Sequence, residues 1–116
     1  MISKTEKLNG AMLVSVLAGT IVSLVLGFVT FLLTAGGHGT YLPAALLFPG
    51  PLLIGILKKE IGGFSIAVAL LQWPSYFLLF NLLRNADHKN AGIIVLSLLH
   101  GTLAIACFVS DSGQFL

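Results

Sequence analysis

Long stretches without a single charged residue limit what this chain can fold into. Three such runs, residues 8–57, 61–83 and 90–110, contain 50, 23 and 21 residues. A helix needs about 20 apolar residues to cross the ~30 Å hydrocarbon core of a bilayer. The two shorter runs therefore predict one crossing each, and the longest run predicts two crossings joined by a turn.

The composition points to the same class of protein. Of 116 residues, 57% are hydrophobic and 9% are charged, whereas soluble domains contain roughly 25% charged residues. So few polar side chains cannot cover the surface of a soluble chain of this size. The apolar runs are also continuous rather than alternating, which argues against a β-barrel. We therefore predict an all-α integral membrane protein, a four-helix transmembrane bundle formed as a single domain over residues 1–116.

The four predicted spans cover approximately residues 10–34, 42–57, 61–83 and 91–109. The first ends at a glycine-rich turn, residues 35–39, because glycine permits the backbone conformations of tight turns. The uncharged stretch that forms most of this span, residues 8–33, is 26 residues long. The apolar core of a secretory signal peptide has only about 7–15 residues, so a retained helix is favoured.

The second span is interrupted at its centre by Pro49, Gly50 and Pro51. A proline inside a helix lacks the N–H group that the carbonyl four residues earlier would accept from. Pro49 and Pro51 thus free the carbonyls of Ala45 and Leu47, which in hydrocarbon need partners from other helices, side chains or water. We predict a proline-broken second helix.

The positive charges predict an orientation. Four crossings place both termini on one side, together with Lys4, Lys7, Lys58 and Lys59, whereas the other side has Arg84 and Lys89. Cytoplasmic loops carry the excess of lysine and arginine. We therefore expect both termini in the cytoplasm, with the protein in the inner or plasma membrane.

Polar residues gather at one depth of the predicted bundle. Gln72 lies eleven residues from either end of the third span, and His100 lies nine residues from either end of the fourth. Ionisable side chains are costly inside a membrane and are functional candidates there. The two side chains either line a hydrated cavity or hydrogen bond to each other in a dry core. The candidate residues for a substrate or ion pathway are His100, Gln72, Pro49, Gly50, Pro51, Tyr76 and His38.

Small residues recur every fourth position along the first span. This spacing places them on one helix face, where a second helix backbone can approach closely. Packing within the chain and self-association both remain open. The stripe consists of Ala11, Ser15, Gly19, Ser23 and Gly27.

These features favour two functions. The first is a channel- or transporter-like protein with a mid-membrane polar site, acting in the bilayer as a homo-oligomer. The alternative is an accessory, assembly or immunity-type subunit that packs against a larger membrane partner. No carboxylate lies within a predicted span and the chain has one cysteine, Cys107. We therefore expect no enzyme activity, no metal site and no cofactor, and the small net charge of +2 argues against a nucleic-acid partner.

Overall fold

The computed structural model describes residues 3–34 and 40–116, and every regular element in this part of the chain is a helix. The first, α1, covers Lys4–Leu33 and has 30 residues. It begins with a capping box. The Ser3 hydroxyl accepts from the Glu6 N–H at 3.1 Å, and the Glu6 carboxylate accepts from the Ser3 N–H at 3.1 Å. The pair satisfies two N–H groups that have no partner within the helix.

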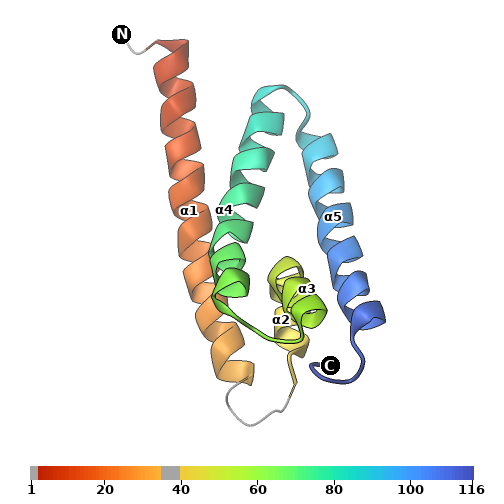
Figure 1. Cartoon of the computed structure of the whole chain (residues 1–116). Coiled ribbons are helices and arrows are strands. Elements are labelled where there is room, and N and C mark those ends of the chain that lie inside the picture. The colour runs from red at the N-terminus through yellow and green to blue at the C-terminus, as the bar shows by residue number, and fades with distance from the viewer. Residues whose placement is uncertain (1–2, 35–39) are drawn as a thin grey trace.

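Two further long helices, α4 (Gly63–Asn85) and α5 (Lys89–Ser110), form an antiparallel pair (Figure 1). Their short connection turns at Asp87, which has a left-handed φ of 61°. The following N–H, of His88, donates to the carbonyl of Leu83 at 2.7 Å. In the described residues, α1, α4 and α5 are the three helices long and apolar enough to cross a membrane. The all-α class is thus confirmed for the described residues, and these three helices have the length and hydropathy of membrane-spanning helices.

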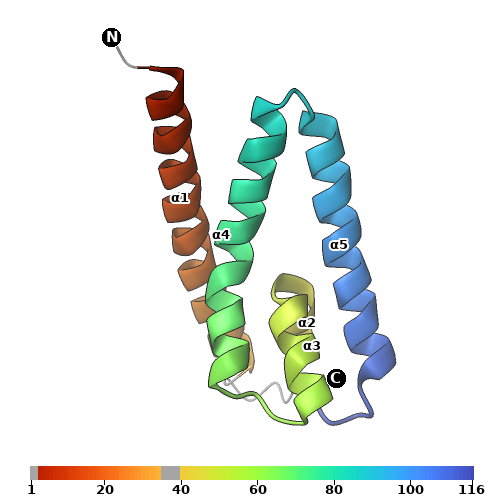
Figure 2. The ribbon, with the colours of Figure 1, turned by 45° about the horizontal axis from the view of Figure 1, so that its top comes forward.

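The segment predicted as the second span forms a hairpin of two short helices. Its parts are α2 (Leu42–Leu47) and α3 (Pro49–Lys58), which meet at mid-height of the molecule and return to the same end (Figures 1 and 2). The Tyr41 N–H donates to the Phe115 carbonyl at 2.9 Å, and the Gln114 amide donates to the Lys59 carbonyl at 3.0 Å. Both ends of the hairpin therefore contact the same C-terminal segment, residues 111–116.

The expected four-helix bundle is not confirmed. The predicted break in the second helix is present, but the chain reverses there instead of continuing across. The ten residues of α3 rise by only about 15 Å, which is half of a ~30 Å hydrocarbon core. The described elements are therefore three long helices and a half-depth hairpin.

This hairpin changes where the two ends of the chain lie. A unit that turns back does not change sides, so the start of α1 and the carboxyl end of the chain lie at opposite ends of the molecule (Figure 1). The expectation of both termini on one side is thus not confirmed. Lys4 and Lys7, at the start of α1, share an end with the α4–α5 connection, and the mouth of the hairpin lies at the other end.

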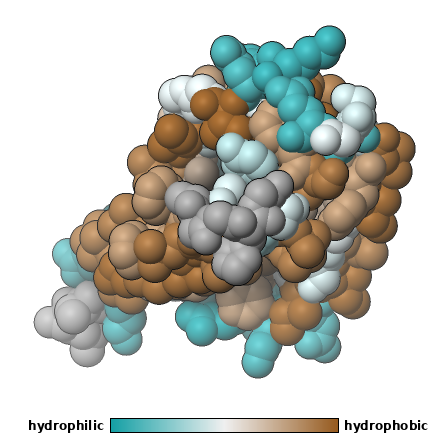
Figure 3. Space-filling view, turned by 90° about the horizontal axis from the view of Figure 1, so that it is seen from below, coloured by the Kyte–Doolittle hydropathy of each residue, from teal (hydrophilic) through white to brown (hydrophobic). Residues whose placement is uncertain are grey.

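Buried apolar side chains gather where the hairpin meets α5 and the C-terminal segment. They are Ala45, Leu52, Ile56, Cys107 and Phe115. Elsewhere many large apolar side chains are exposed, and hydrophobic residues make up most of the surface seen from the hairpin end (Figure 3). Lipid tails are as apolar as leucine, so this surface suits a bilayer.

Candidate functional site at the hairpin tip

The tip of the hairpin is a break in the backbone at Phe48. Its φ of −135° and ψ of 59° are not helical, because a following proline disfavours the helical conformation. α3 then begins with Pro49 and Pro51, neither of which has an N–H group. The carbonyls in the last turn of α2 must therefore find partners outside the helix.

Gln72, from the middle of α4, provides one partner. Its Nε2 donates to the carbonyl of Leu47 at 2.9 Å, and the residue is only 8% exposed. This is the carbonyl that the sequence predicted to be freed by Pro51. The other amide atom, Oε1, lies beside Gly50, where an added Cβ would be 3.4 Å from it. Gln72 thus fixes the tip from the α4 side.

His100, from the middle of α5, provides the second partner. Its Nε2 lies 2.6 Å from the carbonyl oxygen of Leu46. A carbonyl only accepts, so Nε2 carries the proton and donates. In the neutral ring Nδ1 is then the acceptor, and it receives the Tyr76 hydroxyl at 3.2 Å. His100 and Gln72 therefore hold adjacent carbonyls of one turn, and they do not bond to each other.

Aromatic rings surround the histidine on its other side. The ring centroids of Trp73 and Tyr76 lie 6.0 and 5.8 Å from that of His100, and 5.5 Å from each other. These three side chains border a cavity of about 510 Å³ between α4 and α5. The remaining lining residues are Phe77, Phe80, Leu96, Ser97 and Gly101. This cavity extends from His100 toward the α4–α5 connection, and Gln72 is not part of its lining.

Cys107 makes a contact with the tip that the sequence did not predict. Its thiol is fully buried and donates to the carbonyl of Pro49 at 3.1 Å. The signal available in the sequence was its spacing, since Cys107 follows His100 by seven residues and thus shares its helix face. Three side chains from two helices therefore hold the tip.

The comparisons with known proteins identify no relative. No family model matches the chain, and no curated protein or solved structure is significantly similar to it. Function must therefore be argued from the geometry and chemistry of the site.

Asp111 organises the C-terminal segment that closes the mouth of the hairpin. Its carboxylate accepts from the N–H groups of Gly113, Phe115 and Leu116 at 3.0 to 3.1 Å. Desolvation raises the pKa of Asp111, but the backbone N–H donors outweigh it and hold the pKa below its ordinary value. The ring of Phe115 then packs edge-on against Tyr41, with centroids 5.2 Å apart. An aspartate two residues before a glycine was the sequence signal for this turn.

The small-residue stripe packs within the chain at two of its positions. Gly19 is buried against α4, where an added Cβ would lie 2.7 Å from the Pro74 nitrogen and 2.8 Å from the Trp73 carbonyl oxygen. Ser23 is also buried and donates to the Ala69 carbonyl at 3.3 Å. The backbones of α1 and α4 are therefore in close contact at Pro74.

The other stripe residues have different surroundings. The Ser15 hydroxyl donates to the Ala11 carbonyl of its own helix at 2.9 Å. Gly27 borders a second cavity, which lies between α1, the hairpin and α4. Of the remaining pathway candidates, His38 lies outside the described residues. Within those residues, no three His, Cys, Asp or Glu side chains are grouped as metal ligands would be.

Proposed function

We propose that this chain is a small membrane transport protein of channel or transporter type, whose polar path includes the hairpin tip and the α4–α5 cavity. The observation that carries the proposal is His100, an ionisable side chain at mid-depth that both binds the tip and lines a cavity of about 510 Å³. Many transporters form their sites at interrupted helices of this depth, and intramembrane ionisable residues mark such paths.

Each polar group has a part in this proposal. Nδ1 of His100 and the Tyr76 hydroxyl share one hydrogen bond that faces the cavity. A proton or a small polar solute can replace that bond, since both atoms have donor and acceptor forms. Gln72 keeps the hairpin tip in place while His100 exchanges partners. The turn formed by Pro49, Gly50 and Pro51 then lies at the mid-membrane end of the path.

A single chain leaves this path open to the side. Ser97, which lines the cavity, is exposed, and in a bilayer its hydroxyl would face lipid. A polar group in hydrocarbon without a partner is unfavourable. We therefore propose that copies of the chain associate and that the neighbouring copy closes the cavity.

The charges give the proposed orientation. With three crossings, one side holds Lys4, Lys7, Arg84 and Lys89, and the hairpin side holds Lys58 and Lys59. The positive-inside rule places the larger group in the cytoplasm. The start of α1 and the α4–α5 connection are then cytoplasmic, and the mouth of the hairpin faces out of the cell.

Ion flux into liposomes tests the function. Purified protein is reconstituted with the dye pyranine inside the vesicles, and proton entry is followed under a potassium gradient with valinomycin. We expect entry above that of empty liposomes, and its loss in His100→Ala with helix content retained. Ser75→Ala, on an exposed face of α4 outside the cavity lining, is the matched control and should keep the flux. Flux equal to that of empty liposomes, or unchanged in His100→Ala, contradicts proton transport through this site.

A subunit that packs against a partner remains the second candidate. The observation in its favour is the first half of α1, where an added Cβ at Gly10 would meet nothing within 4 Å and Leu13 and Val14 are 61% and 65% exposed. Ala11→Leu should release a co-purifying membrane protein if this face is the interface. Gly19→Leu would not test this interface, because Gly19 packs against α4 within the chain.

A further inference from the structure

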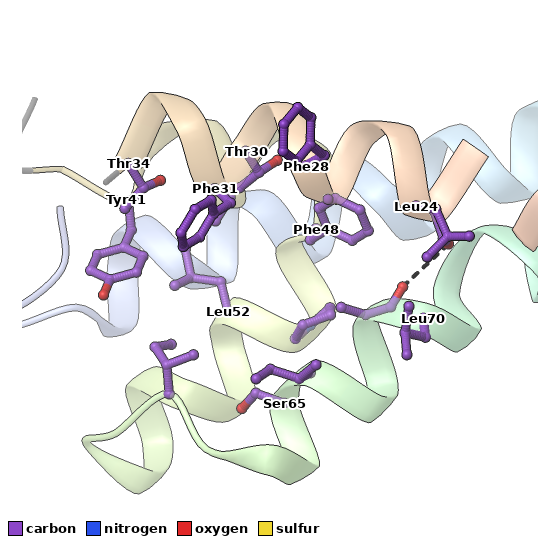
Figure 4. A pocket seen from close by; sticks show the side chains of 17 residues that line it. Leu24, Phe28, Thr30, Phe31, Thr34, Tyr41, Phe48, Leu52, Ser65 and Leu70 are labelled. Carbon is purple, nitrogen blue, oxygen red and sulfur yellow. Dashed lines mark hydrogen bonds between the residues drawn. The ribbon is translucent and has the colours of Figure 1, made fainter. Parts of the chain in front are cut away.

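A second cavity lies between α1, the hairpin and α4, in the half of the molecule near the hairpin mouth. Its volume is about 610 Å³, within the range of about 300–1,000 Å³ found for small-molecule sites. It is elongated, with Thr34 and Tyr41 at one end and Leu24 and Leu70 at the other (Figure 4). The first two residues lie near the end of α1, so the cavity runs inward from the membrane surface.

The walls of this cavity are suited to an apolar occupant. Phe48 and Leu52 line it from the hairpin, and Phe28 and Phe31, which are 62% and 64% exposed, border it from α1 (Figure 4). Cavities lined by such side chains do not hold water, and they bind apolar molecules. An empty cavity would also forfeit the dispersion contacts of its lining atoms.

In the part of the chain that the structure describes, two buried hydroxyl groups on the α1 side of this cavity have no hydrogen-bond partner. They are those of Thr30 and Thr34. Elsewhere on the same helix, Thr20 donates to the Val16 carbonyl at 2.8 Å. An unsatisfied buried hydroxyl is costly, so the two threonines indicate a polar group of a ligand beside them.

Length and charge define the class of ligand. Along α1 the lining extends from Ser23 to Thr34, which is about 16 Å at 1.5 Å per residue. This is the depth of one leaflet of a ~30 Å core, and therefore the length of one acyl chain. Lys58 and Lys59 end α3 shortly before Ile61, which lines the cavity. They place positive charge at the end where a lipid phosphate would lie.

We propose that this cavity binds one acyl chain of a bilayer phospholipid. The ester group accepts hydrogen bonds from Thr30 and Thr34, and the phosphate lies toward the two lysines. The lipid fills the space that the half-length hairpin leaves beside α1. It thereby joins α1 to the hairpin where the protein itself makes few contacts.

Retained lipid after purification in detergent tests the proposal. Gly27→Leu fills the cavity, and an added Cβ there meets only the Phe48 ring, at 4.0 Å. Gly10→Leu on the same helix is the matched control, because nothing lies within 4 Å of its added Cβ. Native mass spectrometry should find one phospholipid on the wild type and on Gly10→Leu, and none on Gly27→Leu. Equal lipid on both variants, or none on the wild type, overturns the proposal.

A second pair of variants covers the case in which Gly27→Leu fails to fold. Thr30→Val and Thr34→Val keep the shape of the side chain and remove the hydroxyl. Each should weaken retention of added palmitoyl-oleoyl phosphatidylglycerol about fivefold, the effect of one hydrogen bond. Thr20→Val, whose hydroxyl bonds its own helix, should not change retention. Unchanged retention in both cavity variants would count against the assigned polar end.

Discussion

The two halves of this molecule are held together differently. Near the hairpin mouth, side chains and backbone groups from distant segments bond to one another, as Tyr41 does to Phe115 and Gln114 to Lys59. Near the start of α1, large apolar side chains are exposed instead, and Val14 is 65% exposed. The difference follows from the proline break. Carbonyls that lose their helical donors need specific partners, so the sequence-specific contacts gather in the half that contains the hairpin.

Substitution of Gly19 should have the largest effect on stability. A side chain at this position collides with the backbone of Pro74 and Trp73, which cannot move without displacing α4. We expect Gly19→Leu to lower the free energy of unfolding by about 3 kcal/mol or more, because overpacking against backbone is poorly tolerated. Denaturant titration in micelles measures it.

Gly10→Leu is the control from the weakly packed half of the same helix. Its added side chain enters open space, so stability should change by less than about 0.5 kcal/mol. Equal losses in the two variants would show that α1 packs uniformly and would remove the contrast between the halves.

Loss of a partner at the hairpin tip should have a smaller effect. His100→Ala removes the donor to the Leu46 carbonyl, and Gln72→Leu removes the donor to Leu47. Each should cost about 0.6–1.7 kcal/mol, as side-chain hydrogen bonds between membrane helices do. Ser97→Ala, on an exposed face of α5, should cost less than either in the same micelle assay. A larger cost for Ser97→Ala would contradict the assignment of these bonds.

Acid should release the C-terminal segment before it affects the helices. The pKa of Asp111 is lowered in the folded state, so its contribution to stability is present above the ordinary carboxyl pKa and is lost as the pH falls through the folded value. Amide exchange at Gly113, Phe115 and Leu116 should increase in that acidic window. Asp111→Asn should show fast exchange already at neutral pH, and protection that persists in this variant would exclude the carboxylate as the anchor.

The three long helices of the described residues were predictable from the sequence, because the length of a charge-free run and its hydropathy determine such helices. The break at Pro49 and Pro51, and the need to pair the Leu47 carbonyl, also followed from residue chemistry. What sequence reasoning missed was the reversal of the chain. A run of apolar residues next to prolines is compatible with both a kinked crossing and a hairpin. The choice depends on contacts made by residues far away in the chain.

The hydrogen-bond partners of the polar residues were likewise predictable only in part. Counting residues from the ends of each predicted span placed Gln72 and His100 at the same depth. In the structure both side chains hydrogen bond to carbonyls of the same turn. The count did not show that they bind separate carbonyls, since that depends on the rotation of α4 and α5 about their axes. The part of Asp111 was missed for a simpler reason. It lies after the last predicted span, where a charged residue is expected to be solvated in a loop.

Sidedness of residue 59 tests the central claim, the half-depth hairpin, most directly. In a Cys107→Ala background, single cysteines replace Lys7, Thr40, Lys59 and Ser112, and sealed vesicles are treated with a membrane-impermeant maleimide. The hairpin predicts that positions 40, 59 and 112 react from one side and position 7 from the other. If position 59 reacts from the same side as position 7, and position 40 from the opposite side, the segment crosses the membrane and the account is wrong.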